Sequence, residues 1–395
     1  MMAAVCIGTS AAKAKQGGNA YDLNRPFGWA CCTALTSGDD YQMTGGAAKG
    51  ARTVVLKSTG QDMHDAIIAA IEQNDSIILD GSAGPFTVST TMYLRDLKNK
   101  TVIGRNGARV CTQFVLTPEI RQMMDDNHVL GLSTAGGATP YVLPSGARVR
   151  EECEYTIRKL LIEKLNDPRE NFRHCGLFNL NGCENMVFRN LTLVGPGAID
   201  IGGDDLMTAT HGTRHLWVDH VEFIDGVDGN FDINGFSDFI TVSWCRFRYT
   251  ERTYVHANTN LIGSNDRAEM NGEDNLNVTY YACEWGERCN QRMPMVRFGT
   301  IHLLNCYYNC ARNAAAINPR FHSEVLIEGC SFAPGVKNIF KQTDAKAYVF
   351  RNNIYAEQFQ QPADLGTVTL PYKYQTMPTT EVADIVHKYA GACFN

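Results

Sequence analysis

Two arginines lie five positions apart in the short apolar stretch "NQRMPMVRFG", residues 290–299, with Pro294 between them. The 395-residue chain has a formal charge of −6, so a polyanionic ligand could bind only with local help from clustered arginines or from a bound cation. Arg292 and Arg297 could supply that help. Two arginines that merely cover the surface of the fold are the alternative interpretation.

Aspartates form the second group of residues that could take part in chemistry. Residues 217–244 contain Asp219, Asp225, Asp228, Asp232 and Asp238. Asp228 and Asp232 are four positions apart, an even spacing that directs both carboxylates to one side of an extended strand. Asp204 and Asp205 precede this run and could stack beneath it. Converging carboxylates suit a hard cation such as Ca²⁺, and the alternative is a set of solvated turn residues, because Asp beside Gly is typical of turns.

Strand-like octets recur through the second half of the chain and would position both groups. Their sixth residues are Leu191, Val221, Cys245, Cys283, Cys306, Cys330 and Asn353, and their eighth residues are Leu193, Phe223, Phe247, Trp285, Tyr308, Phe332 and Tyr355. The spacing is 23 or 24 residues apart from two longer insertions. A period of this length with strand-rich repeats predicts an all-β solenoid, a parallel β-helix.

Four of the 14 cysteines fall in one column of this repeat. The repeat therefore predicts a ladder of buried thiols inside the solenoid, in preference to disulfides or a catalytic thiol. No pair of cysteines has the CxxC spacing that is typical of zinc sites, which argues against a zinc site.

The remaining segments indicate one domain, residues 15–395, with additions. The spacing predicts a helix over 63–73 that caps the open end of the solenoid, a helical insertion around 113–171, and a second helix over 380–393. Residues 1–14 resemble the remnant of an export signal, which predicts a secreted, periplasmic or cell-surface protein.

Composition limits the partners. No stretch approaches the roughly 20 apolar residues of a membrane span, and the acidic charge argues against nucleic-acid binding. A solenoid with capped ends is expected to be a monomer.

The motifs together resemble a known family. The segments "LWVDHVEF", "DGNFDINGFSDFITVSWCRF", "LIGSND", "VTYYACEW" and "QRMPMVRFGTIHLLNCYY" follow the order and approximate spacing of the extracellular pectate lyases of polysaccharide lyase family 1. The resemblance covers residues 27–112 and 175–356. It implies a right-handed parallel β-helix that binds and cleaves pectate.

The resemblance also implies roles for single residues. Arg292 falls on the family's catalytic base, and Arg297 on the arginine that holds the substrate carboxylate. The calcium ligands would be Asp205, Asp228 and Asp232. Asp204 would replace a further ligand whose family position falls on Gly203. Arg288, Arg312 and Arg320 would extend the basic groove.

One position departs from the family pattern. Pectate-specific members carry a lysine five residues before the glycine of "LIG", and Asn258 occupies that position here. A lysine there would bind a galacturonate carboxylate through its charge. Asn258 therefore marks a substrate-binding position that binds the substrate differently.

The implied reaction is β-elimination in α-1,4-linked polygalacturonate, with loss of the C5 proton and expulsion of the oxygen at C4. Ca²⁺ would stabilise the charge that develops on the substrate carboxylate. A guanidinium ordinarily stays protonated, so the arginine base requires either like-charge repulsion from Arg297 and Ca²⁺ or alkaline solvent. Both routes predict an alkaline optimum.

Three other functions remain open at this point. A pectin lyase would act on methyl-esterified chains without metal, and Asn258 favours it. A hydrolase is suggested by the paired acids of "GGDD". A non-catalytic pectin-binding β-helix would use the same fold without turnover.

Overall fold

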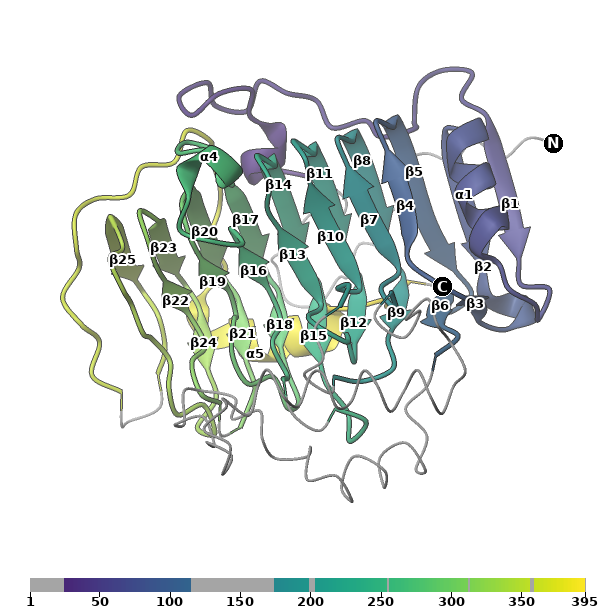
Figure 1. Ribbon diagram of the computed structural model, residues 1–395. Helices are drawn as coiled ribbons and strands as arrows, with labels where there is room; N and C mark the ends of the chain where they lie inside the picture. The colour runs from purple at the N-terminus through teal and green to yellow at the C-terminus, as the bar shows by residue number, and fades with distance from the viewer. Residues whose placement is uncertain are drawn as a thin grey trace, which may run out of the picture.

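The computed structural model describes residues 25–114, 174–198, 203–253, 256–311, 313–355 and 359–394. In these ranges the strands form three parallel sheets, and the chain passes through the sheets once per coil (Figure 1). The fold is a right-handed parallel β-helix, as the sequence predicts.

The first sheet, sheet A, has ten strands, and sheets B and C have eight and seven. Sheet A contains β1 (Thr53–Lys57), β2 (Ser76–Asp80), β5 (Lys98–Arg105), β8 (Glu184–Arg189), β11 (Arg214–Asp219), β14 (Asp238–Ser243), β17 (Val278–Tyr281), β20 (Thr300–Leu304), β23 (Glu324–Glu328) and β25 (Ala347–Arg351). Sheet B contains β3 (Phe86–Val88), β6 (Arg109–Thr112), β9 (Thr192–Val194), β12 (Glu222–Ile224), β15 (Arg246–Arg248), β18 (Glu284–Trp285), β21 (Tyr307–Tyr308) and β24 (Ser331–Phe332). Sheet C contains β4 (Met92–Arg95), β7 (Phe178–Asn181), β10 (Met207–Thr210), β13 (Phe231–Ile233), β16 (Leu261–Ile262), β19 (Met295–Val296) and β22 (Asn318–Pro319).

The predicted octets span the corner between sheets A and B. Each coil turns this corner at one residue with a left-handed backbone. These residues are Asn190, His220, Trp244, Ala282, Asn305, Gly329 and Asn352, with φ between 50° and 60°. Asn and Gly accept this conformation readily, whereas the large rings of His220 and Trp244 are held there by packing, since they stack with centroids 5.8 Å apart.

Two ladders of side chains, each from one equivalent position in successive coils, fill the interior. The thiols of Cys245, Cys283, Cys306 and Cys330 are fully buried and free, which confirms the predicted ladder. The eighth column forms a stack of aromatic rings, with centroid distances of 5.6 Å for Phe247 to Trp285 and 4.8 Å for Trp285 to Tyr308. Both ladders bury apolar surface only when neighbouring coils stay in register.

Helices lie at the ends and along the wall of the solenoid. The helix α1 (His64–Gln73) buries Ile67 and Ile71 against the first coils and confirms the predicted cap. The helix α5 (Thr379–Tyr389) matches the predicted C-terminal helix and packs through Val382 and Val386. Three shorter elements are α4 (Ala268–Asn271) and the 3₁₀ turns η1 (Gly28–Cys31) and η2 (Gly81–Ala83).

Two predicted segments fall outside the described residues. One is the export-signal remnant, residues 1–14, and the other is the insertion around 113–171 apart from its first two residues. None of the helices in the described ranges has the length and apolar character needed to cross a membrane.

The thiol ladder leads to a labelling prediction. Burial raises the pKa of Cys283, Cys306 and Cys330 far above the ordinary thiol value, so these thiols are both enclosed and protonated. We expect iodoacetamide to leave them unmodified in the native protein and to modify them fully in denaturant, as measured by peptide mass spectrometry. Exposed Cys393, whose pKa is raised to about 11, serves as the control and should react in the native state at alkaline pH. Modification of the ladder in the folded protein would contradict the assignment.

Candidate functional site

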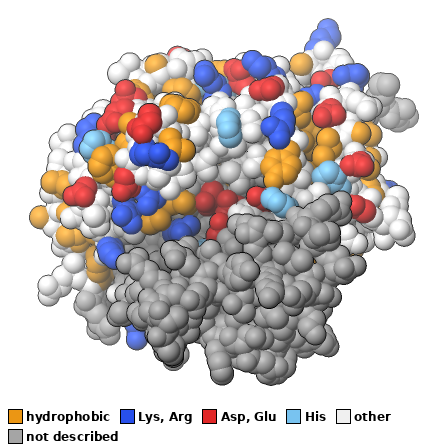
Figure 2. All heavy atoms as spheres, in the orientation of Figure 1, with side chains coloured by type: hydrophobic (Ala, Val, Ile, Leu, Met, Phe, Trp, Pro, Cys, Tyr) orange, Lys and Arg blue, Asp and Glu red, His pale blue; other side chains and the backbone are white. Residues whose placement is uncertain are grey.

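Sheet C brings the predicted carboxylates to one face. Asp232 lies in β13, and its backbone partner on the neighbouring strand β10 is Thr208. The Thr208 hydroxyl donates to Asp205 Oδ2 over 3.2 Å, so Asp205, which precedes β10, faces the same region. Figure 2 shows acidic side chains near the middle of the face in view, with basic side chains beside them.

Gly229 keeps the space between two of these carboxylates open. A Cβ atom added to Gly229 would lie 2.6 Å from Asp205 Oδ1 and 3.3 Å from Asp232 Oδ1. The two carboxylate oxygens therefore flank one point that only a glycine leaves clear.

Burial and like charge act together on this cluster. Burial raises the pKa of Asp205 well above its usual range, the charges of Asp232 and Asp228 raise it further, and Arg292 opposes the shift. Burial likewise raises the pKa of Asp232 to about 7, with Arg292 again opposing. These charge effects place Asp205, Asp228, Asp232 and Arg292 in one neighbourhood, and their joint role as a metal and catalytic site stays a prediction.

Asp228 is held by a histidine. Its Oδ1 lies 3.0 Å from Nε2 of the buried His256. The side-chain amide nitrogen of Asn258 lies 3.0 Å from the same ring nitrogen. Asn258 is 2% exposed. It is linked to the carboxylate cluster by His256, which lies between Asn258 and Asp228. Direct contact of Asn258 with substrate stays a prediction.

Arg292 approaches the carboxylates from the coil of β19. Its backbone is left-handed, with φ of 60°, and its carbonyl accepts a hydrogen bond from Asn260 N at 2.7 Å. The side chain is half-buried. Pro294 immediately precedes β19, where its missing N–H costs the ladder little, and its carbonyl accepts from Asn318 N at 3.0 Å.

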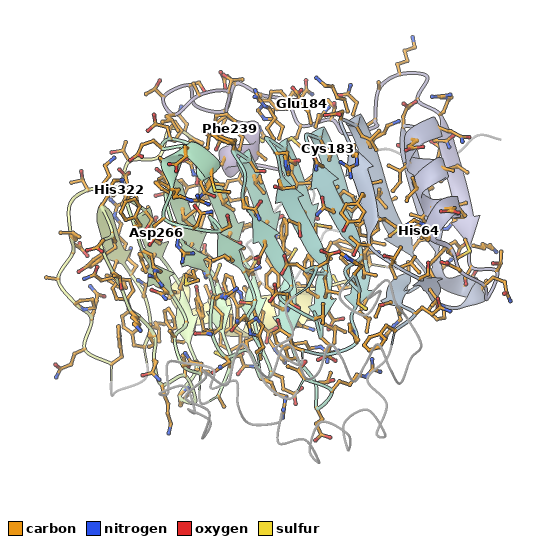
Figure 3. All side chains as sticks on the ribbon, viewed as in Figure 1. His64, Cys183, Glu184, Phe239, Asp266 and His322 are labelled. Atoms are coloured by element: carbon orange, nitrogen blue, oxygen red, sulfur yellow. The ribbon has the colours of Figure 1, made fainter. Side chains whose placement is uncertain are left out.

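Arg297 is fixed beside this group. Its Nε lies 2.5 Å from Asp266 Oδ1, and its Nη1 donates to the Gly263 carbonyl over 2.9 Å. Figure 3 labels Asp266. Burial lowers the pKa of Arg297, and the charges of Arg320 and Arg292 lower it further, although Asp266 opposes the shift. The three arginines therefore form one basic group next to the carboxylates.

The other predicted basic residues have different surroundings. The Nε of half-buried Arg320 is enclosed and has no hydrogen-bond partner among the described residues. Arg288 donates through Nη2 to the Thr253 carbonyl at 3.1 Å. Arg312 lies outside the described residues.

Asp204 is engaged elsewhere. Its Oδ2 accepts hydrogen bonds from Thr91 Oγ1 at 2.7 Å and Tyr93 OH at 3.0 Å, and it lies 3.1 Å from His174 Nδ1. These partners belong to the coils on the N-terminal side of Asp205. Its role as a fourth metal ligand stays a prediction.

The Asp219 and His220 pair belongs to the wall of the solenoid. Both side chains are fully buried. Asp219 Oδ2 lies 2.7 Å from His220 Nδ1 and 2.8 Å from Arg189 Nε.

The donor set suits a hard divalent cation in its chemistry. Asp205, Asp228 and Asp232 offer carboxylate oxygens, and the shifts of pKa show that their negative charges repel. In the ranges that the structure describes, no three aspartate, glutamate, histidine or cysteine side chains are grouped so that they could hold a metal ion. Asp228 is turned to His256.

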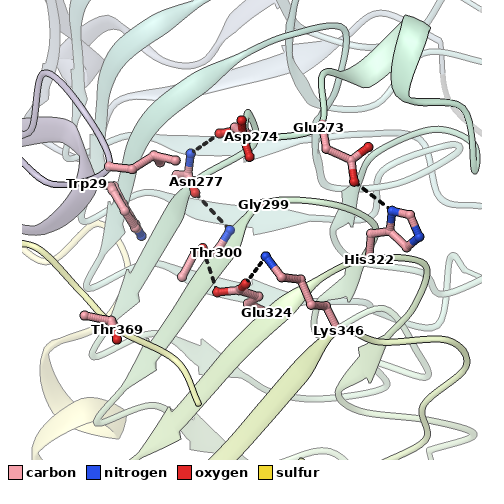
Figure 4. A pocket seen from close by; sticks show the side chains of 11 residues that line it. Trp29, Glu273, Asp274, Asn277, Gly299, Thr300, His322, Glu324, Lys346 and Thr369 are labelled. Carbon is pink, nitrogen blue, oxygen red and sulfur yellow. Dashed lines mark hydrogen bonds and ion pairs between the residues drawn. The ribbon is translucent and has the colours of Figure 1, made fainter. Parts of the chain in front are cut away.

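A separate cavity of about 150 Å³ lies away from this cluster (Figure 4). Its charged side chains are largely paired with one another. Glu324 Oε1 lies 2.6 Å from Lys346 Nζ, and His322 Nδ1 lies 2.8 Å from Glu273 Oε1. The paired charges make it a weaker candidate than the face of sheet C.

Four residues of the site received no role from the sequence, although Gly229 and Asp266 fall within the motifs quoted above. They are Thr208, Gly229, His256 and Asp266. The first two lie in the periodic coils, where a register assignment could have found them. His256 and Asp266 lie in irregular segments, whose path the repeat does not predict.

The fold and the gathered side chains define a parallel β-helix with aspartates and arginines along one sheet, and the comparisons with known proteins give its family. A pectate lyase family model matches residues 170–395, more than half of the chain. The chain therefore belongs to the pectate lyase family.

Individual relatives agree. Pectate lyase A of Emericella nidulans is 30% identical over 219 residues, which cover 54% of this chain and 63% of that protein. Pectate trisaccharide-lyase of Thermotoga sp. (strain RQ2) is 36% identical over 97 residues, 25% of each chain. The chain thus spans less than two thirds of the length of these curated relatives.

Solved structures support the fold. A pectate lyase from Bacillus sp. N165, in complex with trigalacturonate, superposes with a TM-score of 0.60 at 18% identity, covering 93% of this chain and 98% of that one. The major cedar pollen allergen jun a 1 superposes with a TM-score of 0.54 at 16% identity, covering 93% of each chain.

The repulsion within the cluster leads to a stability prediction for Asp232→Asn. The pKa of Asp232 is raised from 3.8 to about 7, so its ionisation costs stability, and that cost grows as the pH rises from about 4 through about 7. Asparagine keeps the Oδ1 that accepts from Leu261 N at 2.9 Å. In a buffer with chelator at pH 8, we expect the variant to be more stable to urea by on the order of 2 kcal/mol, with no gain at pH 4.

Asp204→Asn is the matched control for this measurement, since the Asp204 carboxylate accepts hydrogen bonds instead of facing like charges. It should not gain stability at pH 8. Equal stability of Asp232→Asn and wild type at pH 8 would show that the carboxylates do not strain the fold.

Proposed function

We propose that this chain is a pectate lyase that cleaves α-1,4-linked polygalacturonate by β-elimination, with Arg292 as the base. The observation that carries the proposal is the gathering of Asp205, Asp232 and Arg292, from strand β13 of sheet C and from the segments before β10 and β19, in a chain of the pectate lyase family. The names of the relatives support the substrate class, since one is a pectate trisaccharide-lyase and one solved structure holds trigalacturonate.

Substrate orientation is the role of Arg297. Asp266 and the Gly263 carbonyl hold its Nε and Nη1, which fixes the guanidinium plane before substrate arrives. A fixed guanidinium binds a carboxylate with little further loss of side-chain entropy. Arg297 would therefore set the uronate carboxylate in one position relative to Arg292.

Proton removal is the role of Arg292. The base takes the C5 proton, the electron pair of the C5–H bond forms the C4–C5 double bond, and the C4–O bond breaks to release the leaving chain end. The base must be neutral at that moment, because a guanidinium has no acceptor. A guanidinium loses its proton only in alkaline solution, and the proposal therefore includes an alkaline optimum.

Asp205, Asp228 and Asp232 would hold Ca²⁺ in this proposal. The bound ion would supply Lewis-acid stabilisation of the negative charge that develops on the substrate carboxylate. The alkaline conditions that the proposal requires also ionise Asp232, since its pKa of about 7 lies below them. The same pH range therefore suits the base and the carboxylate.

A metal-independent pectin lyase is the second candidate, and the surroundings of Asn258 favour it. This position carries a buried amide in place of the family's lysine, so it offers no positive charge to a free uronate carboxylate. A methyl ester would not need one. The hydrolase and the non-catalytic binding protein remain as outcomes of the tests below, and secretion and a monomeric state remain part of the prediction.

Replacement of Arg292 by lysine tests the base. Lysine keeps the positive charge and loses the geometry of the guanidinium, so we expect turnover of polygalacturonate at alkaline pH to fall by about 10²- to 10⁴-fold. Binding of trigalacturonate, measured by calorimetry, should change far less. The ultraviolet absorbance of the unsaturated product measures turnover.

Arg109→Lys is the matched control, because Arg109 is exposed on β6 of sheet B. It should retain full turnover. Retained turnover in Arg292→Lys would reject the assignment of the base.

Removal of calcium tests the metal. We expect chelator to abolish the absorbance change on polygalacturonate and added Ca²⁺ to restore it. In Asp228→Asn and Asp232→Asn, the calcium concentration for half-maximal activity should rise at least about tenfold, the effect of losing roughly 1.4 kcal/mol of binding free energy.

The other outcomes identify the other functions. Absorbance that grows in chelator, and grows faster on methyl-esterified chains, would establish the pectin lyase. New reducing ends without absorbance would establish a hydrolase. Saturable binding without either product would establish a binding protein.

A further inference from the structure

The contact between Asp228 and His256 separates one of the proposed calcium ligands from the other two. Asp228 Oδ1 lies 3.0 Å from His256 Nε2, whereas Asp205 and Asp232 flank the point that Gly229 leaves open. As the described side chains stand, they form no group of three that could hold a metal ion. Asp228 therefore has to turn away from His256 before the three carboxylates can bind one cation.

The surroundings of Asp228 allow this turn. Asp228 lies in the loop between β12 and β13, directly before Gly229. Its side chain is 35% exposed, so protein atoms do not enclose the carboxylate. Its negative charge already acts on Asp205 and Asp232. The carboxylate is thus near the other two and is held away from them by its contact with His256.

His256 itself is fixed. Its ring is buried, with 8% of the side chain exposed. Its backbone is left-handed, with φ of 53°, and its carbonyl accepts a hydrogen bond from Asn258 N at 2.8 Å. The ring therefore stays in place when Asp228 leaves. A buried Nε2–H left without an acceptor would then oppose the departure of Asp228.

Asn258 is a second partner for the same ring nitrogen. Its Nδ2 lies 3.0 Å from His256 Nε2, and its Oδ1 is enclosed and accepts no hydrogen bond from any described residue. A nitrogen of a neutral imidazole carries either a hydrogen or a lone pair. Asp228 requires the hydrogen, whereas Asn258 Nδ2, itself a donor, requires the lone pair. The two contacts at Nε2 are therefore alternatives.

We propose that Asn258 replaces Asp228 as the hydrogen-bond partner of His256 Nε2, and that this exchange releases Asp228 to bind Ca²⁺. In the metal-free state Nε2 carries the ring hydrogen and donates it to Asp228. In the metal-bound state the hydrogen lies on Nδ1, after exchange with water, and Nε2 accepts from Asn258 Nδ2. The ring carries one hydrogen and is neutral in both states. Asn258 is then a positioning residue for the calcium site, and the inference rests on the proposed function.

The tautomer of His256 tests the exchange directly. Nitrogen chemical shifts, measured by NMR on protein labelled at its histidine rings, distinguish a ring nitrogen that carries hydrogen from one that carries a lone pair. At pH 8 we expect Nε2 of His256 to carry the hydrogen in chelator and Nδ1 to carry it in saturating Ca²⁺. The variant His256→Phe identifies the signals by their loss. The same tautomer in both solutions would overturn the inference.

Calcium affinity tests the two partners separately, by calorimetry without substrate. Asn258→Leu removes the second partner, so Nε2 keeps its hydrogen and its contact with Asp228. We expect Kd for Ca²⁺ to rise about fivefold, the effect of one neutral hydrogen bond. His256→Phe removes the contact that holds Asp228, so Kd should fall. An unchanged Kd in Asn258→Leu, or weaker binding in His256→Phe, would contradict the exchange.

The double variant distinguishes the exchange from a role in packing. Without the ring nitrogen Asn258 has no contact to take over, so Asn258→Leu should leave Kd unchanged in the His256→Phe background. Equal effects of Asn258→Leu in both backgrounds would overturn the inference. Asn309→Leu is the matched control, because its amide lies 3.4 Å from Glu284 in sheet B, and it should bind Ca²⁺ as wild type does. Urea denaturation of each variant checks that the fold is intact.

Failure of the proposed function gives a different result from failure of this inference. If wild type forms no unsaturated product but binds Ca²⁺ with the change of tautomer, the exchange is supported without the lyase reaction. If wild type forms the product and the tautomer does not change, the reaction is supported and the exchange is rejected. Wild type that binds no Ca²⁺ in calorimetry would reject the exchange as well.

Discussion

The in-register stacking of the coils is the constraint on which the site depends. A shift of one residue would turn each inward side chain outward, and the buried ladders of thiols and aromatic rings resist such a shift. The wall is therefore rigid. Side chains that lie far apart in the chain, such as Asp205 and Asp232, come together because their coils are neighbours and cannot slide.

The same rigidity produces the tension within the site. A flexible loop would let Asp205 and Asp232 separate, whereas strands β10 and β13 hold them beside one point that Gly229 leaves open. The raised pKa values of both groups express this cost. Asp204 shows the contrast, since one position earlier in the chain a carboxylate is stabilised by three polar neighbours.

The repeat made the coils and the thiol ladder predictable, because the register of a periodic fold is visible in the spacing of its apolar residues. The helical spacing over 63–73 made the capping helix predictable. The even spacing of Asp228 and Asp232 likewise indicated a shared face. The contacts of His256 and Asp266 were not predictable, since they lie in irregular segments where no period applies. For the same reason the burial of Asn258 beside His256 could not be read from its position in a motif.

Charge on the face of sheet C is arranged in sections along the solenoid axis. Carboxylates occupy the coils of β10 and β13, a basic group that includes Arg297 and Arg320 follows toward β22, and Arg95 stands alone on β4. A polyanion lying along this face meets positive charge at both ends and negative charge in the middle. In the proposed function, the middle would accept the polyanion only with a cation between them. The charge pattern would then separate the parts of the face that hold the polymer from the part where it reacts.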